Sequence, residues 1–125
     1  MSATSTIKPI VLIVEDEFLI RMSIVHFFED AGFDTLEALS ADNAKLILNK
    51  GIPISIIFTD IDMPGSINGL QLAWIVSENY PYIRVVVGSG RSRPAESDLP
   101  NGAIFFPKPY DFTALKPAIL HNNPI

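Results

Sequence analysis

The stretch Ile54–Leu70, ISIIFTDIDMPGSINGL, gives the clearest indication of the fold. Its apolar first half is typical of a strand that is buried on both faces of a parallel sheet. The strand ends in Asp60, a second acid follows at Asp62, and Pro64 and Gly65 then turn the chain. Because Asp, Pro, Gly and Asn are common turn residues, the acids alone fit an ordinary turn as well as a reactive carboxylate at a strand end.

Further strands are expected on both sides of this stretch. Apolar runs suited to buried strands occupy residues 10–14, 83–89 and 103–106. Residues 33–38, FDTLEA, also resemble a strand, but they are less apolar. We therefore expect that strand at an edge of the sheet, where one side of it is less covered.

Segments with helical periodicity alternate with these strands. Ser40 and Asn68 are expected N-caps, because their side chains accept hydrogen bonds from the first turn of a helix. In the helix after Asn68, we expect Leu70, Ala73 and Trp74 to face inward. The expected helices cover residues 17–32, 41–51, 69–81 and 111–121.

The alternation of strands and helices predicts an α/β fold, a doubly wound parallel sheet with helices on both faces. Ligands bind such sheets beyond the carboxyl ends of the strands. Polar residues occur at these ends, and we expect them on one rim of the sheet: Glu15–Glu17 after the first strand, Asp60 on the third, Ser89 on the fourth and Lys108 after the last.

Each of these residues alone has an ordinary explanation. Acids stabilise helix N-termini, and a serine often bonds its own backbone in a turn. Together they indicate chemistry, because crowded carboxylates repel one another unless a cation enters, and carboxylate oxygens suit Mg²⁺. A lysine and a hydroxyl on the opposite side suit phosphoryl oxygens. We therefore predict a Mg²⁺ site in which Asp60 carries a phosphoryl group.

The composition limits the remaining possibilities. The 125 residues, 48% of them hydrophobic, suit one globular domain over residues 1–125, with residues 1–8 as a flexible tail. A net charge of -5 argues against a nucleic-acid partner, and the absence of cysteine excludes disulfides. No apolar run is long enough to cross a membrane and no signal peptide is evident, so we expect a cytoplasmic protein.

Four motifs together resemble one protein family, the response-regulator receiver domains of two-component signalling. They are VLIVEDE (11–17), FTDIDMPGSINGL (58–70), VVVGSG (85–90) and FFPKPY (105–110), and they cover essentially the whole chain. The resemblance implies a flavodoxin-like, five-stranded sheet in the order 2-1-3-4-5 with five helices. It also implies that Asp60 accepts a phosphoryl group from a sensor histidine kinase or a histidine phosphotransfer protein. Output would then pass to a downstream protein target through protein contacts.

The same resemblance assigns a metal site. Glu15, Asp16 and Asp60 would hold Mg²⁺, Asp16 directly and Glu15 through water. The backbone carbonyl of Asp62 would complete the protein ligands.

The resemblance also implies a switch. Ser89 would be the switch hydroxyl, Lys108 would pair with the phosphoryl oxygens, and Phe105 would reorient together with Ser89. The Lys108–Pro109 peptide bond is expected to be cis, which aims the lysine at the site. Two further residues, Asp62 and Arg91, are expected to modulate the lifetime of the phosphoryl group, because each lies two positions after a site residue.

Two features depart from the family pattern. Residues 89–108 contain Pro94 and Pro100, so we expect the fourth helix to be short or irregular. The last helix contains Pro117, which removes a helical hydrogen bond. Receivers usually form dimers and output contacts on this face, so we expect a remodelled face and a monomer or weak dimer.

Two other functions remain open. The sequence DID at Asp60–Asp62 also resembles the nucleophile and acid of haloacid-dehalogenase-like phosphatases, although that motif belongs on a first strand. A binding module that takes no phosphate is the second alternative. In the favoured interpretation the protein is not an enzyme with a separate substrate, since it catalyses only its own phosphorylation and dephosphorylation. The chain fits a stand-alone regulator, a relay intermediate or a fragment of a larger protein.

Overall fold

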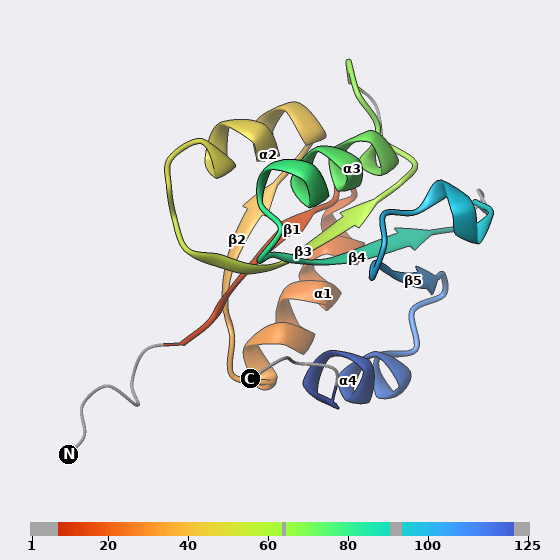
Figure 1. The fold of residues 1–125 in the computed structure, drawn as a ribbon. Helices are drawn as coiled ribbons and strands as arrows, with labels where there is room; N and C mark the ends of the chain where they lie inside the picture. The colour runs from red at the N-terminus through yellow and green to blue at the C-terminus, as the bar shows by residue number, and fades with distance from the viewer. Residues whose placement is uncertain (1–7, 64, 91–93, 122–125) are drawn as a thin grey trace.

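The computed structural model describes residues 8–63, 65–90 and 94–121. Its centre is a five-stranded sheet in the order β2-β1-β3-β4-β5, and every strand pair is parallel (Figure 1). This order confirms the one implied by the family resemblance, including the edge position of β2. The strands are β1 (Ile10–Val14), β2 (Asp34–Ala38), β3 (Ile54–Asp60), β4 (Arg84–Ser89) and β5 (Ile104–Pro107).

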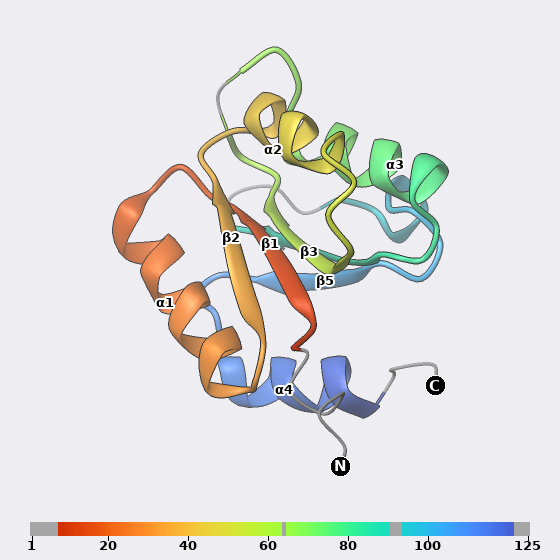
Figure 2. The same ribbon diagram turned by 90° about the vertical axis from the view of Figure 1, so that its left-hand side faces the viewer.

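Helices cover both faces of the sheet. Figure 2 shows α2 and α3 on one face and α1 and α4 on the other. Side chains alternate between the two faces along a strand, so Ile57 packs into the core beside α2 and α3, whereas Phe58 packs into the core beside α1 and α4. The helices are α1 (Phe18–Asp30), α2 (Ala41–Leu48), α3 (Gly69–Asn79) and α4 (Phe112–His121). Among the described residues, no helix has the length and apolar character needed to cross a bilayer.

The expected caps of α2 and α3 are confirmed. The Ser40 side chain accepts a hydrogen bond from the backbone N–H of Asn43 at 3.0 Å. At the start of α3, the Asn68 side chain accepts from the Gln71 N–H, and the Gln71 side chain accepts from the Asn68 N–H, both at 2.8 Å. This reciprocal capping box fixes where α3 begins, directly after the loop that carries Asp62.

The prediction that Trp74 faces inward was wrong. The buried positions of α3 are Gly69, Leu72, Ala73 and Val76, which follow the helical spacing of three and four residues. Trp74 is one residue beyond Ala73, so its side chain is turned away from the core, and it is 40% exposed.

The described residues between β4 and β5 form no regular fourth helix, as expected. In the residues that the structure describes there, only a three-residue 3₁₀ helix, η2 (Glu96–Asp98), is formed. The count of five helices implied by the resemblance is therefore corrected to four α-helices in the described part of the chain. The indole N–H of Trp74 donates to the carbonyl of Asp98 at 2.7 Å, which ties this segment to α3.

Pro117 does not end the last helix. It lies inside α4, which continues to His121. Proline has no backbone N–H, so the Thr113 carbonyl lacks its helical hydrogen-bond donor. Both Thr113 and Pro117 are exposed residues. The Arg84 side chain donates to the carbonyls of Ala118 and Ile119 and so supports the end of the helix.

Candidate functional site

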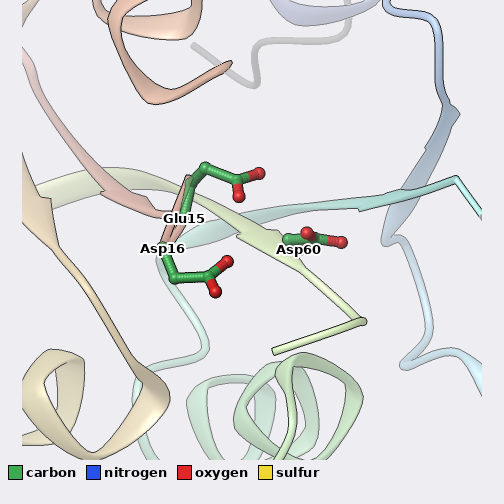
Figure 3. A group of neighbouring side chains, drawn as sticks. All are labelled: Glu15, Asp16 and Asp60. Carbon is green, nitrogen blue, oxygen red and sulfur yellow. The ribbon is translucent and has the colours of Figure 1, made fainter. Parts of the chain in front are cut away.

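The carboxyl ends of four strands bring the predicted polar residues to one rim. Glu15 and Asp16 follow β1, Asp60 ends β3, Ser89 ends β4 and Lys108 follows β5. Figure 3 shows Glu15, Asp16 and Asp60 extending from two neighbouring strand ends. A cleft of about 510 Å³ opens over them, lined by Glu15, Asp16, Glu17, Ile20, Asp60, Asp62, Gly90 and Lys108.

The three carboxylates form a tight cluster. One oxygen from each of Glu15, Asp16 and Asp60 lies within 4.8 Å of the others. Glu15 and Asp60 are only 1% and 2% exposed, whereas Asp16 is exposed. Burial raises the pKa of Glu15 to about 7; the Glu17 N–H opposes this increase, and the negative charge of Asp60 adds to it. Burial also raises the pKa of Asp60.

Lys108 provides the positive charge in the cleft. Its ammonium nitrogen lies 3.2 Å from Asp60 Oδ2 and 3.7 Å from Glu15 Oε1. Partial burial lowers the pKa of Lys108, but the attraction of Asp60 and Glu15 outweighs it, so the pKa is raised. The lysine is therefore a permanent cation beside Asp60. The Lys108–Pro109 peptide bond is cis, as predicted.

Asp62 and Ser89 contact one another at the side of the cleft. The Asp62 N–H donates to Asp60 Oδ1 at 3.1 Å, which orients the Asp60 carboxylate. The Ser89 hydroxyl donates to Asp62 Oδ2, also at 3.1 Å. Ser89 is 3% exposed. The Ser89 hydroxyl, which was predicted to act as the switch, thus contacts the second acid of the DID sequence, a pairing that sequence analysis did not anticipate.

Two residues that position the site were missed in the sequence. Arg21 is buried, donates to the Glu15 carbonyl at 3.1 Å and pairs with Glu37 at 2.8 Å, so it holds the end of β1. A Cβ at Gly69 would lie 1.8 Å from the Asp60 carbonyl oxygen. The absence of a side chain therefore lets α3 begin directly against the end of β3. The one signal available in the sequence concerned Arg21, because an arginine within the largely apolar first helix is unusual.

Two predicted residues lie outside the cleft or outside the described chain. Phe105 is half-buried on β5 and packs against the core beside α2 and α3. It also lines a hollow of about 830 Å³ together with Trp74 and Leu99. Arg91, expected to modulate the phosphoryl lifetime with Asp62, falls outside the described residues.

Residues 11–119 match the model of one protein family, described as the response regulator receiver domain. The chain belongs to that family. Receiver domains are not an enzyme family in the usual sense. In this receiver domain Asp60 ends the third strand, so the fold gives no support to the haloacid-dehalogenase alternative, whose nucleophile lies on the first.

The receiver domain is similar to parts of longer proteins and to other receivers. A putative NtrX-like response regulator of Rickettsia felis is 38% identical over 81 residues, which are 64% of this chain and 17% of that protein. The sensor kinase/phosphatase LuxN of Vibrio campbellii is 30% identical over 94 residues, 75% of this chain and 11% of LuxN. The chain therefore spans only a small part of either relative.

A solved structure gives the likeness in three dimensions. The response regulator receiver protein from Sinorhizobium medicae superposes with a TM-score of 0.82 at 26% identity, and the match covers 91% of this chain and 93% of that one. The sheet order and the placement of the strand ends are therefore those of a receiver.

The carboxylates of this receiver domain fit a Mg²⁺ ion. Mg²⁺ binds oxygen at about 2.0–2.1 Å, so two ligands of one ion lie at most about 4 Å apart. The oxygens of Glu15, Asp16 and Asp60 are spread over 4.8 Å, so a small inward shift brings them into range. In addition, Glu15 Oε1 is buried and accepts no hydrogen bond from any described residue, which leaves a carboxyl oxygen able to bind a ligand.

The raised carboxylate pKa values predict how stability changes with pH in the metal-free receiver domain. A carboxyl group whose pKa is higher in the folded state binds more protons there, so the free energy of unfolding falls as pH rises. For Glu15 this fall takes place between its ordinary value of 4.5 and about 7. We expect a loss of about 2–3 kcal/mol between about pH 5 and pH 8.

Urea unfolding in the presence of a chelator measures this change. The Glu15→Gln variant should lose most of the pH dependence, because glutamine does not titrate. Glu78→Gln, which changes an exposed acid on α3, should keep it. A stability profile of Glu15→Gln that matches that of the wild type would contradict the prediction.

Proposed function

We propose that this receiver domain accepts a phosphoryl group on Asp60 from the phosphohistidine of a sensor histidine kinase or a histidine phosphotransfer protein. The observation that carries the proposal is the contact of Asp60 with Lys108 beside two further carboxylates. The Asp60 oxygen is 3.2 Å from the ammonium nitrogen, and Asp60 is held rigidly at the end of a central strand. A nucleophile, a cation and a candidate metal site thus converge on one open cleft.

In the proposed reaction, an Asp60 carboxylate oxygen attacks phosphorus. The new P–O bond forms as the P–N bond to the donor imidazole breaks, and the imidazole nitrogen keeps the electron pair and takes up a proton. Lys108 neutralises charge on the phosphoryl oxygens, and the Asp62 N–H orients the Asp60 carboxylate through Oδ1. Mg²⁺ held by Glu15, Asp16, Asp60 and the Asp62 carbonyl would neutralise the remaining phosphoryl charge when bound.

The Ser89 contact suggests how phosphorylation is read out. A phosphoryl group adds about -1.5 to -2 charges at the rim, and it competes with Asp62 for the Ser89 hydroxyl. Asp62 thus favours the unphosphorylated state and modulates the phosphoryl lifetime. When Ser89 moves toward the phosphoryl group, Phe105 on the adjacent strand reorients, and this changes the surface around β5. The downstream partner is a protein that distinguishes these two surfaces, and the domain acts as a monomer or weak dimer.

Stoichiometry tests the proposal against the phosphatase alternative. In Mg²⁺ and a small phosphodonor such as acetyl phosphate, we expect one acid-stable but base-labile acyl phosphate per chain, followed by slow loss. Sustained release of phosphate from an aromatic phosphomonoester, in many turnovers per chain, would instead favour the phosphatase. No incorporation with either donor would favour the binding module.

The proposed donor docks beside the cleft, where the first turn of α1 carries an apolar surface. Phe18 and Leu19 are 60% and 77% exposed, and they directly follow the acids after β1. We expect Leu19→Ala to slow phosphotransfer from a phosphorylated histidine protein about fivefold, since burying an exposed leucine side chain contributes about 1 kcal/mol or more.

The same variant should react with acetyl phosphate at the wild-type rate, because a small donor needs no docking surface. Leu46→Ala is the matched control, since Leu46 is 64% exposed on α2. Equal slowing with both donors would show that Leu19 acts on the site itself and not on docking.

A further inference from the structure

Tyr110 lies at the same rim but has no part in the function proposed above. It belongs to the loop between β5 and α4. Its ring stacks on Phe106, with centroids 5.1 Å apart and planes at 12°. It also meets the ring of Phe58 edge-on, at 5.3 Å and 80°. These two contacts fix the direction in which the phenol hydroxyl points.

The hydroxyl points over Gly88 in β4. A Cβ at Gly88 would lie 2.2 Å from the hydroxyl oxygen, so only glycine leaves room for it. Gly88 is the register partner of Asp60 in β3. Asp60 follows Phe58 by two residues, so both side chains lie on the face of the sheet that carries Tyr110. The contact between Gly88 and Tyr110 thus places a phenol hydroxyl next to the end of β3, the strand that carries Asp60.

The hydroxyl has no acceptor in the described part of the chain. Its oxygen is buried and forms no hydrogen bond there. Burying an unpaired hydroxyl opposes folding, and phenylalanine would avoid this cost. Such a group therefore calls for a functional explanation. Tyr110 lies beside the ion pair of Lys108 and Asp60. The Lys108 nitrogen is 5.9 Å from the Tyr110 ring centroid and 3.2 Å from Asp60 Oδ2.

We propose that Tyr110 is a positioning residue for the phosphorylated state. In that state its hydroxyl donates to Asp60 Oδ2, the carboxyl oxygen that Lys108 holds in the unphosphorylated protein. The inference rests on the proposed function, in which Lys108 turns to the phosphoryl oxygens and releases that carboxyl oxygen. Tyr110 then replaces the lost bond and keeps the acyl group oriented. Because the hydroxyl gains its partner only after phosphorylation, it shifts the two-state equilibrium toward the phosphorylated form.

Tyr110→Phe tests the inference because it removes only the hydroxyl. The probe is beryllofluoride with Mg²⁺, which binds a carboxylate oxygen as a stable mimic of a phosphoryl group. We expect about tenfold weaker beryllofluoride binding by calorimetry, the effect of losing a hydrogen bond to a strongly polar acceptor. The Mg²⁺ affinity without beryllofluoride should be unchanged, and the urea midpoint should be equal to or higher than that of the wild type. Tyr82→Phe, at a 65% exposed tyrosine, should match the wild type in all three measurements.

The outcomes separate this inference from the proposed function. Unchanged beryllofluoride binding by Tyr110→Phe, with normal binding by the wild type, would overturn the role of the hydroxyl and leave the acceptor role of Asp60 intact. A lower urea midpoint would also overturn it, because the hydroxyl would then support folding in the unphosphorylated state. If the wild type itself fails to bind beryllofluoride, the failure lies with the proposed function.

Discussion

The Asp60→Asn variant is expected to take up no phosphoryl group from acetyl phosphate in Mg²⁺, a complete loss of labelling. Asparagine has nearly the shape of aspartate but lacks the anionic oxygen that attacks phosphorus. The variant should still fold, because burial disfavours the charged carboxylate at this position and Lys108 retains Glu15 at 3.7 Å. Mass spectrometry of the intact chain measures the label, and cooperative urea unfolding verifies the fold.

Asp34→Asn is the matched control, since Asp34 is an exposed acid at the start of the edge strand β2. It should be labelled as fast as the wild type. Undiminished labelling of Asp60→Asn would remove Asp60 from the role of acceptor, whatever the behaviour of the control.

The second large effect is expected for Asp16→Ala, which should lose both Mg²⁺ binding and phosphorylation. Asp16 supplies one of the three clustered carboxylates, and Mg²⁺ held by few protein oxygens depends strongly on each of them. Because Asp16 is exposed, its removal should leave the free energy of unfolding nearly unchanged. Calorimetric titration with Mg²⁺ and the rate of labelling measure the two effects separately.

The affinity of the wild type for Mg²⁺ should also fall in acid, because the carboxylate ligands bind the metal only when deprotonated. Asp30→Ala, at an exposed acid at the end of α1, is the control. If Asp16→Ala is phosphorylated at the wild-type rate in Mg²⁺, its assignment as a ligand is wrong.

The sheet and its rim were predictable because they depend on patterns within short segments. The continuous apolar run of β3 is characteristic of a strand covered on both faces, and the less apolar β2 lies at the edge as expected. Parallel strands then place their carboxyl ends together, which is why Asp60, Ser89 and Lys108 could be assigned to one site from the order of the chain alone.

Contacts that depend on side-chain direction were not predictable in this way. Trp74 was assigned to the core from its helical spacing with Leu70, and the start of the helix was predicted correctly. The buried stripe of α3 instead passes through Leu72, Ala73 and Val76, which leaves Trp74 outside it. The Ser89–Asp62 hydrogen bond depends on the path of the loop after β3, which no local pattern specifies. The close approaches at Gly69 and Gly88 likewise require knowledge of which backbone or side chain lies opposite.

The central claim is that Asp60 carries the phosphoryl group, and reductive trapping tests it most directly. Borohydride reduces an aspartyl phosphate to homoserine, so the phosphorylated residue is marked permanently and can be located by peptide mass spectrometry. After reaction with acetyl phosphate and Mg²⁺, we predict homoserine at position 60 and at no other acid, in proportion to the phosphate incorporated. The account predicts neither homoserine at Asp16 or Asp62 nor the corresponding reduction product, hydroxynorvaline, at Glu15. Phosphate incorporation with an unmodified Asp60 would contradict it.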